Sequence, residues 1–321
     1  MFEENDNIYP VKPKLLTGTQ GRNRTGMLVL GLILLFFSTT YFSESYLLLL
    51  ELLIVLVVHE FGHFLMMRKY GAKAQGMFFM SFLGNSMKDL KNCNSQKQQA
   101  IINIMGPLPG VVIGCGLYVY TLYAEPNLFL FELGLLFIGV NLVNLTPIDP
   151  FDGGRIIEAF YFSGDDQRKM IFTLVSSILM IAVGVVLSFL PLIIFGFLMG
   201  LKVRSYQKSK ELHIQLDETN VDYKKEYKDL TNREYWKIRS AFLTNNPKLK
   251  EMIPSGYTLW ENEKLLMEQV RQILRTNSKP DISFLGKISI ILLMLFLITI
   301  PVLLILSNYE MIDWYLENAN F

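Results

Sequence analysis

The stretch YLLLLELLIVLVVHEFGHFLMM (residues 46–67) is an almost unbroken apolar run that carries two histidines near its end. A helix needs about 20 apolar residues to cross the hydrocarbon core of a bilayer, so this run predicts a transmembrane helix. Ionisable side chains inside such a helix are costly, at about 2.5–3.5 kcal/mol for a central charge, and they usually mark function. We therefore expect the rest of the fold to be arranged around this helix.

The motif in this helix is His59-Glu60-Phe61-Gly62-His63. Histidines four positions apart lie on one face of a helix, where both imidazoles can bind the same Zn²⁺ ion. Glu60, next to the first histidine, can then act as the general base on a zinc-activated water. The alternative is that both histidines only hydrogen-bond to neighbouring helices, but this alternative leaves Glu60 unexplained.

The composition predicts a polytopic membrane protein. Of the 321 residues, 51% are hydrophobic, and they fall in blocks separated by polar connections. The net charge of +1 gives no basic surface for nucleic acid. Cys93 lies in a polar loop and Cys115 in an apolar run, so we expect neither a disulfide nor a cysteine metal site.

The apolar blocks predict an all-α fold with six to seven transmembrane helices. The block at 192–203 is short, and either crosses the membrane as a thin span or is re-entrant. The expected spans are residues 26–42, 46–67, 101–123, 128–145, 170–190, 192–203 and 288–306.

The segments outside the apolar blocks differ in composition. The polar N-terminal segment is interpreted as retained, because no signal-peptide cleavage pattern follows it. Residues 204–280 are charged, and the amphipathic pattern of residues 261–275 indicates a small, mostly helical soluble domain. The expected divisions are a polar segment at 1–25, a membrane core at 26–203, the soluble domain at 204–280, a transmembrane helix at 284–306 and an acidic tail at 307–321.

Residues 72–85 differ in kind from the apolar blocks. They form short aromatic runs bracketed by Gly76 and Gly84, which predicts a short membrane-associated β segment. Non-helical backbone at membrane depth persists only where it is buried in protein or lines a wet cavity. The alternative is an interfacial loop.

The third metal ligand is expected to be a carboxylate, because the remaining histidine, His213, lies in the charged stretch beyond the membrane core. Asp152 sits in a turn (residues 147–154) where two prolines stop helix propagation and two glycines permit positive φ. Asp149, three residues earlier, is the rival ligand. In a third interpretation, both aspartates only cap a helix that begins near Gly153.

Connections that contain lysine or arginine alternate along the chain with connections that contain neither. With a cytoplasmic N-terminus and a crossing at 192–203, the connections 43–45, 124–127 and 307–321 lie outside, and none of them contains Lys or Arg. This pattern favours seven crossings. It predicts a multi-pass protein, taken to lie in a bacterial plasma membrane, with its site toward the cytoplasmic side.

The motif at 59–63, together with NLTPIDPFDGGR at 144–155, resembles the site-2 protease family of intramembrane zinc metalloproteases. The resemblance implies zinc-dependent cleavage of a transmembrane protein or peptide substrate within the lipid bilayer. The roles it implies are zinc ligands for His59, His63 and Asp152, the catalytic acid/base for Glu60, and a contact with substrate or transition state for Asn144.

The resemblance covers about residues 46–160 and leaves the soluble domain without a family. Gly106-Pro107 resembles the Gly-Pro element of the family, and residues 72–85 look like the β segment that presents substrate as an added strand. Pro109-Gly110 replaces the usual Ala-Asn, which puts a substrate role for this element in doubt. The family also often has proline at the position of Asp149 and leucine at that of Phe151.

Two other functions compete with proteolysis. A non-proteolytic relative that retains membrane clients without cutting them is disfavoured by the intact Glu60. A transporter usually shows several polar residues across the bilayer. Here the other acidic residues within the spans are Glu51 and Glu132, both of which we expect to reach the outer interface.

Overall fold

A computed structural model of the chain describes residues 9–14, 46–71, 95–124, 127–253, 256–275, 279–310 and 312. These residues are mostly helical and form no sheet; Ser95 and Lys279 make an isolated bridge. The predicted β segment at 72–85, the predicted span at 26–42, Cys93 and most of the acidic tail lie outside the described residues.

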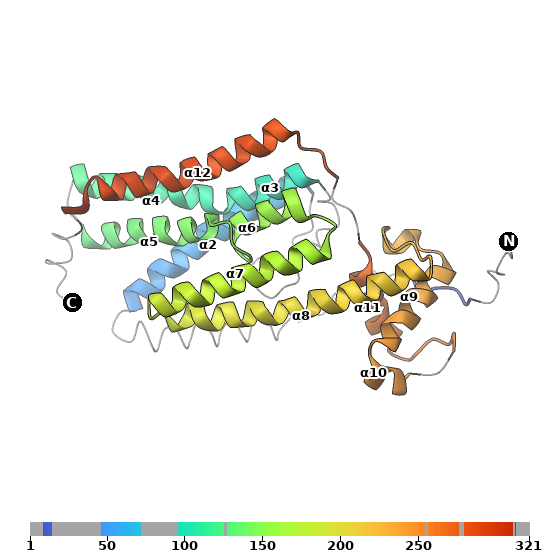
Figure 1. Ribbon diagram of the computed structural model, residues 1–321. Coiled ribbons are helices and arrows are strands. Elements are labelled where there is room, and N and C mark those ends of the chain that lie inside the picture. Colours follow the sequence, from blue (N-terminus) through green and yellow to red (C-terminus); the bar gives the residue numbers. More distant parts are fainter. Residues whose placement is uncertain are drawn as a thin grey trace.

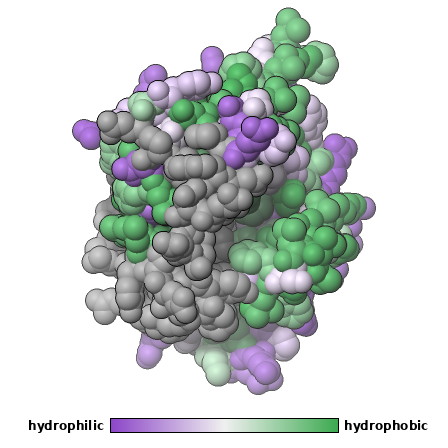
Figure 2. Space-filling model, turned by 90° about the vertical axis from the view of Figure 1, so that its left-hand side faces the viewer, coloured by the Kyte–Doolittle hydropathy of each residue, from purple (hydrophilic) through white to green (hydrophobic). Residues whose placement is uncertain are grey.

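Five described helical stretches are long and apolar enough to cross a membrane, so this is an integral membrane protein. They are Leu47–Lys69, Gln96–Tyr123, Leu128–Leu145, Asp166–Val186 and Phe284–Leu306. Hydrophobic side chains occupy much of the described surface at one end of the bundle (Figure 2). On the first helix, Leu50, Leu53 and Val57 are all about half exposed, as expected of side chains that face lipid.

The first four described helices form one side of the bundle (Figure 1). They are α2 (Tyr46–Lys69), α3 (Gln96–Met105), α4 (Pro107–Tyr123) and α5 (Leu128–Leu145). Helices α3 and α4 follow each other through Gly106 and together make a single apolar stretch. Helices α4 and α5 pack closely because Gly114 faces α5, where a Cβ would lie 2.9 Å from the Ile138 backbone nitrogen.

After α5 the chain makes a short loop and enters α6 (Asp152–Ile157), which continues as the π-helix η3 (Glu158–Phe162). Helix α7 (Asp166–Val186) then runs back along the bundle, and α12 (Phe284–Leu306) packs on α4 and α5. Pro301 lies inside α12 and is buried.

Helix α8 (Leu190–Glu218) is one continuous helix that returns along α7 and extends into the soluble domain (Figure 1). Residues 192–203, predicted as a thin span or a re-entrant piece, are therefore part of a helix that lies beside α7. A Cβ on Gly196 would lie 2.9 Å from the Ser177 carbonyl oxygen, which explains the close packing. Charged residues follow Leu201, and α8 is not among the five stretches that are apolar enough to cross a membrane. The total number of spans therefore stays a prediction.

The predicted soluble domain contains η4 (Tyr227–Asp229), α9 (Asn232–Thr244), α10 (Pro247–Glu251) and α11 (Glu263–Ile273). Its core is aromatic and aliphatic, with Tyr235, Trp236 and Val270 almost fully buried. The predicted amphipathic helix at 261–275 corresponds to α11. The end of α8 joins the same core, so the domain is continuous with the membrane bundle.

A polar junction fixes the domain to the membrane core. The His213 ring on α8 contacts the Asp166 carboxylate at the start of α7 (2.9 Å) and the Ile273 carbonyl of α11 (2.9 Å). Arg275 also pairs with Asp166 and donates to the Gly164 carbonyl (2.9 Å). The soluble domain is therefore tied to the end of the bundle toward which α5 runs.

Candidate metal centre

Three ligand atoms from two helices meet inside the bundle. His59 and His63 lie one turn apart on α2, and their Nε2 atoms are 3.1 Å apart. Asp152, the first residue of α6, places Oδ2 3.2 Å from each of these nitrogens. The three side chains are buried, at 5%, 9% and 5% exposure, and they form a possible metal site.

Each imidazole is oriented by a partner on its other nitrogen. His59 Nδ1 donates to Asn141 Oδ1 (2.8 Å), and His63 Nδ1 donates to the Ile102 carbonyl (2.8 Å). The Asn141 amide is itself fixed, because its Nδ2 donates to the Phe137 carbonyl (2.8 Å). Both Nδ1 atoms therefore carry the proton, and both neutral rings direct an Nε2 lone pair at the same point.

The donor set fits Zn²⁺. Asp152 Oδ2 has no hydrogen-bond donor within the described part of the chain, although it is buried. Two imidazole lone pairs and a carboxylate oxygen that face one another repel unless a cation lies among them. Tetrahedral Zn²⁺ with bonds of about 2.0–2.1 Å separates its ligand atoms by about 3.3 Å, close to the separations observed here.

Glycines let the helices approach closely enough to build this centre. A Cβ on Gly106, between α3 and α4, would lie 2.3 Å from His63 Nε2. A Cβ on Gly62, inside the histidine motif, would lie 1.9 Å from the Met105 carbonyl oxygen. The middle of the motif must therefore lack a side chain for α2 to reach α3, which supplies the carbonyl that orients His63.

The two glycines after Asp152 act differently from our expectation of a positive-φ turn. Both lie in α6, and neither has positive φ. A Cβ on Gly153 would lie 2.2 Å from the Leu145 carbonyl oxygen, and one on Gly154 would lie 2.3 Å from that of Ile148. These glycines allow the preceding loop to fold over α6, which places Asp152 beside α2.

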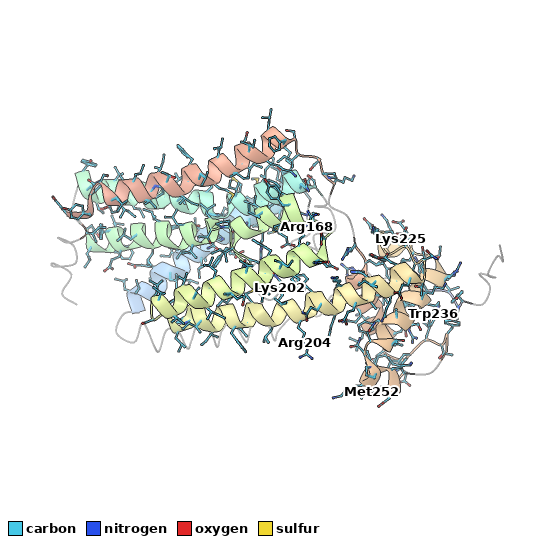
Figure 3. All side chains as sticks on the ribbon, in the orientation of Figure 1. Arg168, Lys202, Arg204, Lys225, Trp236 and Met252 are labelled. Atoms are coloured by element: carbon cyan, nitrogen blue, oxygen red, sulfur yellow. The ribbon has the colours of Figure 1, made fainter. Side chains whose placement is uncertain are left out.

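Asp149, the rival ligand, lies outside the metal cluster. Its carboxylate accepts a hydrogen bond from Thr173 Oγ1 (2.6 Å) and pairs with Lys202 Nζ of α8 (3.2 Å). Figure 3 labels Lys202 on this helix. Neither aspartate caps α6, because the N-cap residue is Phe151 and makes no side-chain cap hydrogen bond. Asp149 instead anchors the loop to α7 and α8.

A cavity of about 520 Å³ opens beside the three ligands. Glu60 from α2 and Asn144 from α5 both line it, so the structure brings together all five residues singled out in the sequence. The Asn144 Nδ2 donates to the Val140 carbonyl (3.0 Å). Most of the remaining wall is apolar, formed by Leu56, Leu135, Leu136, Val140, Val143 and Phe151.

Residues 47–127 match peptidase family M50. A zinc metalloprotease of Methanocaldococcus jannaschii is 32% identical over 112 residues, which are 34% of this chain and 32% of that protein. These similarities support the site-2 protease family for this chain.

Stage IV sporulation protein FB of Bacillus subtilis is 26% identical over 110 residues, which are 34% of this chain and 38% of that protein. The matched segment thus spans about a third of each curated relative. A solved site-2 protease from M. jannaschii aligns over 57% of this chain and 88% of its own, with 20% identity and a TM-score of 0.41.

The sequence reasoning missed two residues of this candidate metal centre. Asn141, which orients His59, was not singled out because it lies within an apolar span. Its position one helical turn before Asn144 could have indicated that both carboxamides face the same side of the helix. Arg155 lines the cavity at the end of the second motif, where it received no role.

Glu51 differs from the expectation that it reaches the outer interface. Its side chain is fully buried within the bundle. Neither carboxylate oxygen has a hydrogen-bond partner among the described residues.

Proposed function

We propose that this protein is a zinc-dependent intramembrane endopeptidase that hydrolyses a peptide bond within or near a transmembrane segment of a membrane-protein substrate. The observation that carries this proposal is the convergence of His59, His63 and Asp152 beside Glu60 in one cavity of the helical bundle. The family match supports the same chemistry.

The two histidines and Asp152 would hold the metal, and the cavity that they line would admit water. When bound, Zn²⁺ lowers the pKa of a bound water to about 7 and polarises a carbonyl group. Asn141 and the Ile102 carbonyl keep both rings in the tautomer that presents Nε2. Such supporting partners typically change metal affinity or activity by about 10–100-fold.

Glu60 carries the proton during hydrolysis. Its carboxylate accepts a proton from the water as the water oxygen adds to the scissile carbonyl carbon. It then returns this proton to the amide nitrogen as the carbon–nitrogen bond breaks, which leaves a carboxylic acid and an amine. Asn144 lines the same cavity. In this proposal it hydrogen-bonds the substrate or its developing negative charge.

The apolar cavity wall supports a membrane-embedded substrate, because aliphatic side chains of α2 and α5 suit an apolar peptide segment. A transmembrane helix resists hydrolysis because its carbonyls are already hydrogen-bonded within the helix. Residues 72–85 are proposed to pair with the unwound substrate as an added strand.

The metal assignment predicts different results for the two aspartates of the loop. Asp152→Ala should leave purified protein with less than one zinc per chain, because it removes the only carboxylate of the donor set. Asp149→Asn should retain one zinc, because this side chain contacts Thr173 and Lys202 instead. Metal analysis of both proteins decides the point, and loss of zinc only from Asp149→Asn would reverse the assignment.

We also propose that the N-terminal segment and the soluble domain share the cytoplasmic side. Residues 9–14 contact the soluble domain, whereas α2 begins at the opposite end of the bundle (Figure 1). The chain between residues 14 and 46 must therefore connect the two ends, which supports a crossing before α2.

Reporter fusions can test this topology. Fusions at residues 20 and 240 should report the cytoplasm, and a fusion at residue 321 should report the outside, because the Lys/Arg-free connections alternate. A cytoplasmic signal at residue 321 would contradict an odd number of crossings, and would mean that either the segment at 26–42 or α8 does not cross.

A further inference from the structure

Residues 9–14 lie on the soluble domain and place one lysine in a site built from carbonyl groups. The Lys12 ammonium donates to the carbonyls of Tyr227 (2.9 Å), Lys228 (2.9 Å) and Leu230 at the end of η4. It also lies 5.4 Å from the centroid of the Tyr227 ring. Three converging acceptors match the three protons of an ammonium group, so this site fits a lysine side chain.

The domain also binds the main chain on both sides of this lysine. Side chains, and not a neighbouring strand, make these contacts, so they recognise an extended segment of particular length and direction. The hydrogen bonds are Lys12 N–H to Asn232 Oδ1 (2.9 Å), Trp236 Nε1–H to the Pro10 carbonyl (2.8 Å) and Tyr227 Oη–H to the Pro13 carbonyl (2.8 Å).

The remaining positions of the segment define a pattern. Pro10 and Pro13 have no N–H group that would need a partner, and their fixed φ favours an extended chain. The Tyr9 ring packs on Tyr257, with centroids 4.8 Å apart. Val11 is 72% exposed, so its side chain is not recognised. The docked segment therefore has the pattern Tyr-Pro-x-Lys-Pro, where x marks an exposed side chain.

We propose that the surface formed by Tyr227, Asn232, Trp236 and Tyr257 is a peptide-recognition site for extended Tyr-Pro-x-Lys-Pro segments. Residues 9–14 of the chain occupy it as a releasable internal ligand, and a partner segment of the same chemistry binds when they leave. Aromatic grooves recognise proline-rich segments in the same physical way. Figure 3 labels Trp236 in the part of the domain that the N-terminal segment approaches. This binding function is separate from the metal centre.

The charge reversal Lys12→Glu in the full chain tests the proposal. It places a carboxylate against three carbonyls, so residues 9–14 should leave this surface. A labelled peptide with the sequence of residues 8–15 should then bind the detergent-solubilised variant at least about 10-fold more tightly than wild type. In wild type, the tethered segment competes at an effective concentration on the order of mM. Fluorescence anisotropy of the labelled peptide measures both affinities.

Matched controls separate recognition from charge. Lys14→Glu makes the same change at an exposed lysine, and should bind the peptide as weakly as wild type. Adding Tyr227→Phe to Lys12→Glu should weaken binding at least about 3-fold, because only the hydroxyl that holds the second proline is lost. Equal binding of a peptide with scrambled sequence, or no binding by a folded Lys12→Glu protein, would overturn the proposal.

Hydrogen exchange on the wild-type chain tests whether residues 9–14 leave the domain. It needs no substitution, so it also applies if Lys12→Glu does not fold. The Lys12 amide should exchange by local opening, at least about 10-fold faster than the amides of α9 but more slowly than in a free peptide. If the Lys12 amide exchanged as slowly as the amides of α9, residues 9–14 would be a permanent part of the domain. If it exchanged at the free-peptide rate, these residues would not dock on the domain. Either result overturns the proposal.

Discussion

Replacement of Glu60 by glutamine should lower cleavage of a membrane-spanning test substrate by at least about 10²-fold, the low end for general acid–base catalysis. Glutamine has nearly the same volume and helix propensity, but it cannot accept the proton of the water at neutral pH. Glu60 lines the cavity and is not one of the three converging ligands. Zinc content and thermal stability should therefore stay close to wild type.

Three measurements on one set of purified proteins make this prediction specific. Cleavage, zinc content and the midpoint of thermal unfolding should be compared for wild type, Glu60→Gln and His63→Ala. His63→Ala should lose both zinc and cleavage, because it removes a ligand. Near-normal cleavage by Glu60→Gln would refute the proposed role of Glu60. If wild type cuts no membrane substrate in a broad screen, while Glu60→Gln retains the same bound clients, a client-binding function should replace proteolysis.

The convergence of His59, His63 and Asp152 on one point could be predicted because much of its geometry is local. Two histidines four positions apart share a helix face whatever the tertiary fold. Asp152 was predicted from the second motif, at residues 144–155. The structure places its Oδ2 atom 3.2 Å from the Nε2 atoms of His59 and His63. The apolar blocks likewise predicted the five apolar helices that the structure describes, because bilayer thickness fixes the length of a span.

Contacts between distant residues could not be predicted in this way. Asp149 stood as a rival ligand because nothing in the local sequence shows Lys202, its partner on α8. The glycines after Asp152 were interpreted as a turn with positive φ. Their real role is to let backbone carbonyls of the preceding loop come close, and this contact is seen only in the folded structure. Asn141 was missed for the same reason, since its histidine partner lies on another helix.

The soluble domain shows the same limit. Its aromatic residues were expected to be core, and Trp236 is indeed almost fully buried. The polar edge of that ring, however, donates to the Pro10 carbonyl of the N-terminal segment. A pattern of hydrophobic residues predicts which face is buried, but it does not show which segment supplies a hydrogen-bond partner.

A single methyl group at position 106 should weaken zinc binding by at least about 10-fold. The Cβ of Gly106→Ala would lie 2.3 Å from His63 Nε2 and 2.4 Å from its Cε1, far inside contact distance. The ring cannot retreat without losing its hydrogen bond to the Ile102 carbonyl (2.8 Å). His63 must therefore leave the position in which its Nε2 meets His59 and Asp152, and partners that orient a ligand typically change metal affinity by about 10–100-fold.

Gly116→Ala is the matched control, because it makes the same change on α4 where a Cβ meets nothing within 4 Å among the described residues. This control should bind zinc as wild type does, and it should be slightly more stable, since alanine favours a helix by about 1 kcal/mol over glycine. Zinc affinity is measured for both proteins by competition with a chelator. Equal affinities for Gly106→Ala and Gly116→Ala would show that His63 does not pack against the α3–α4 junction, and the geometry of the metal centre would have to be revised.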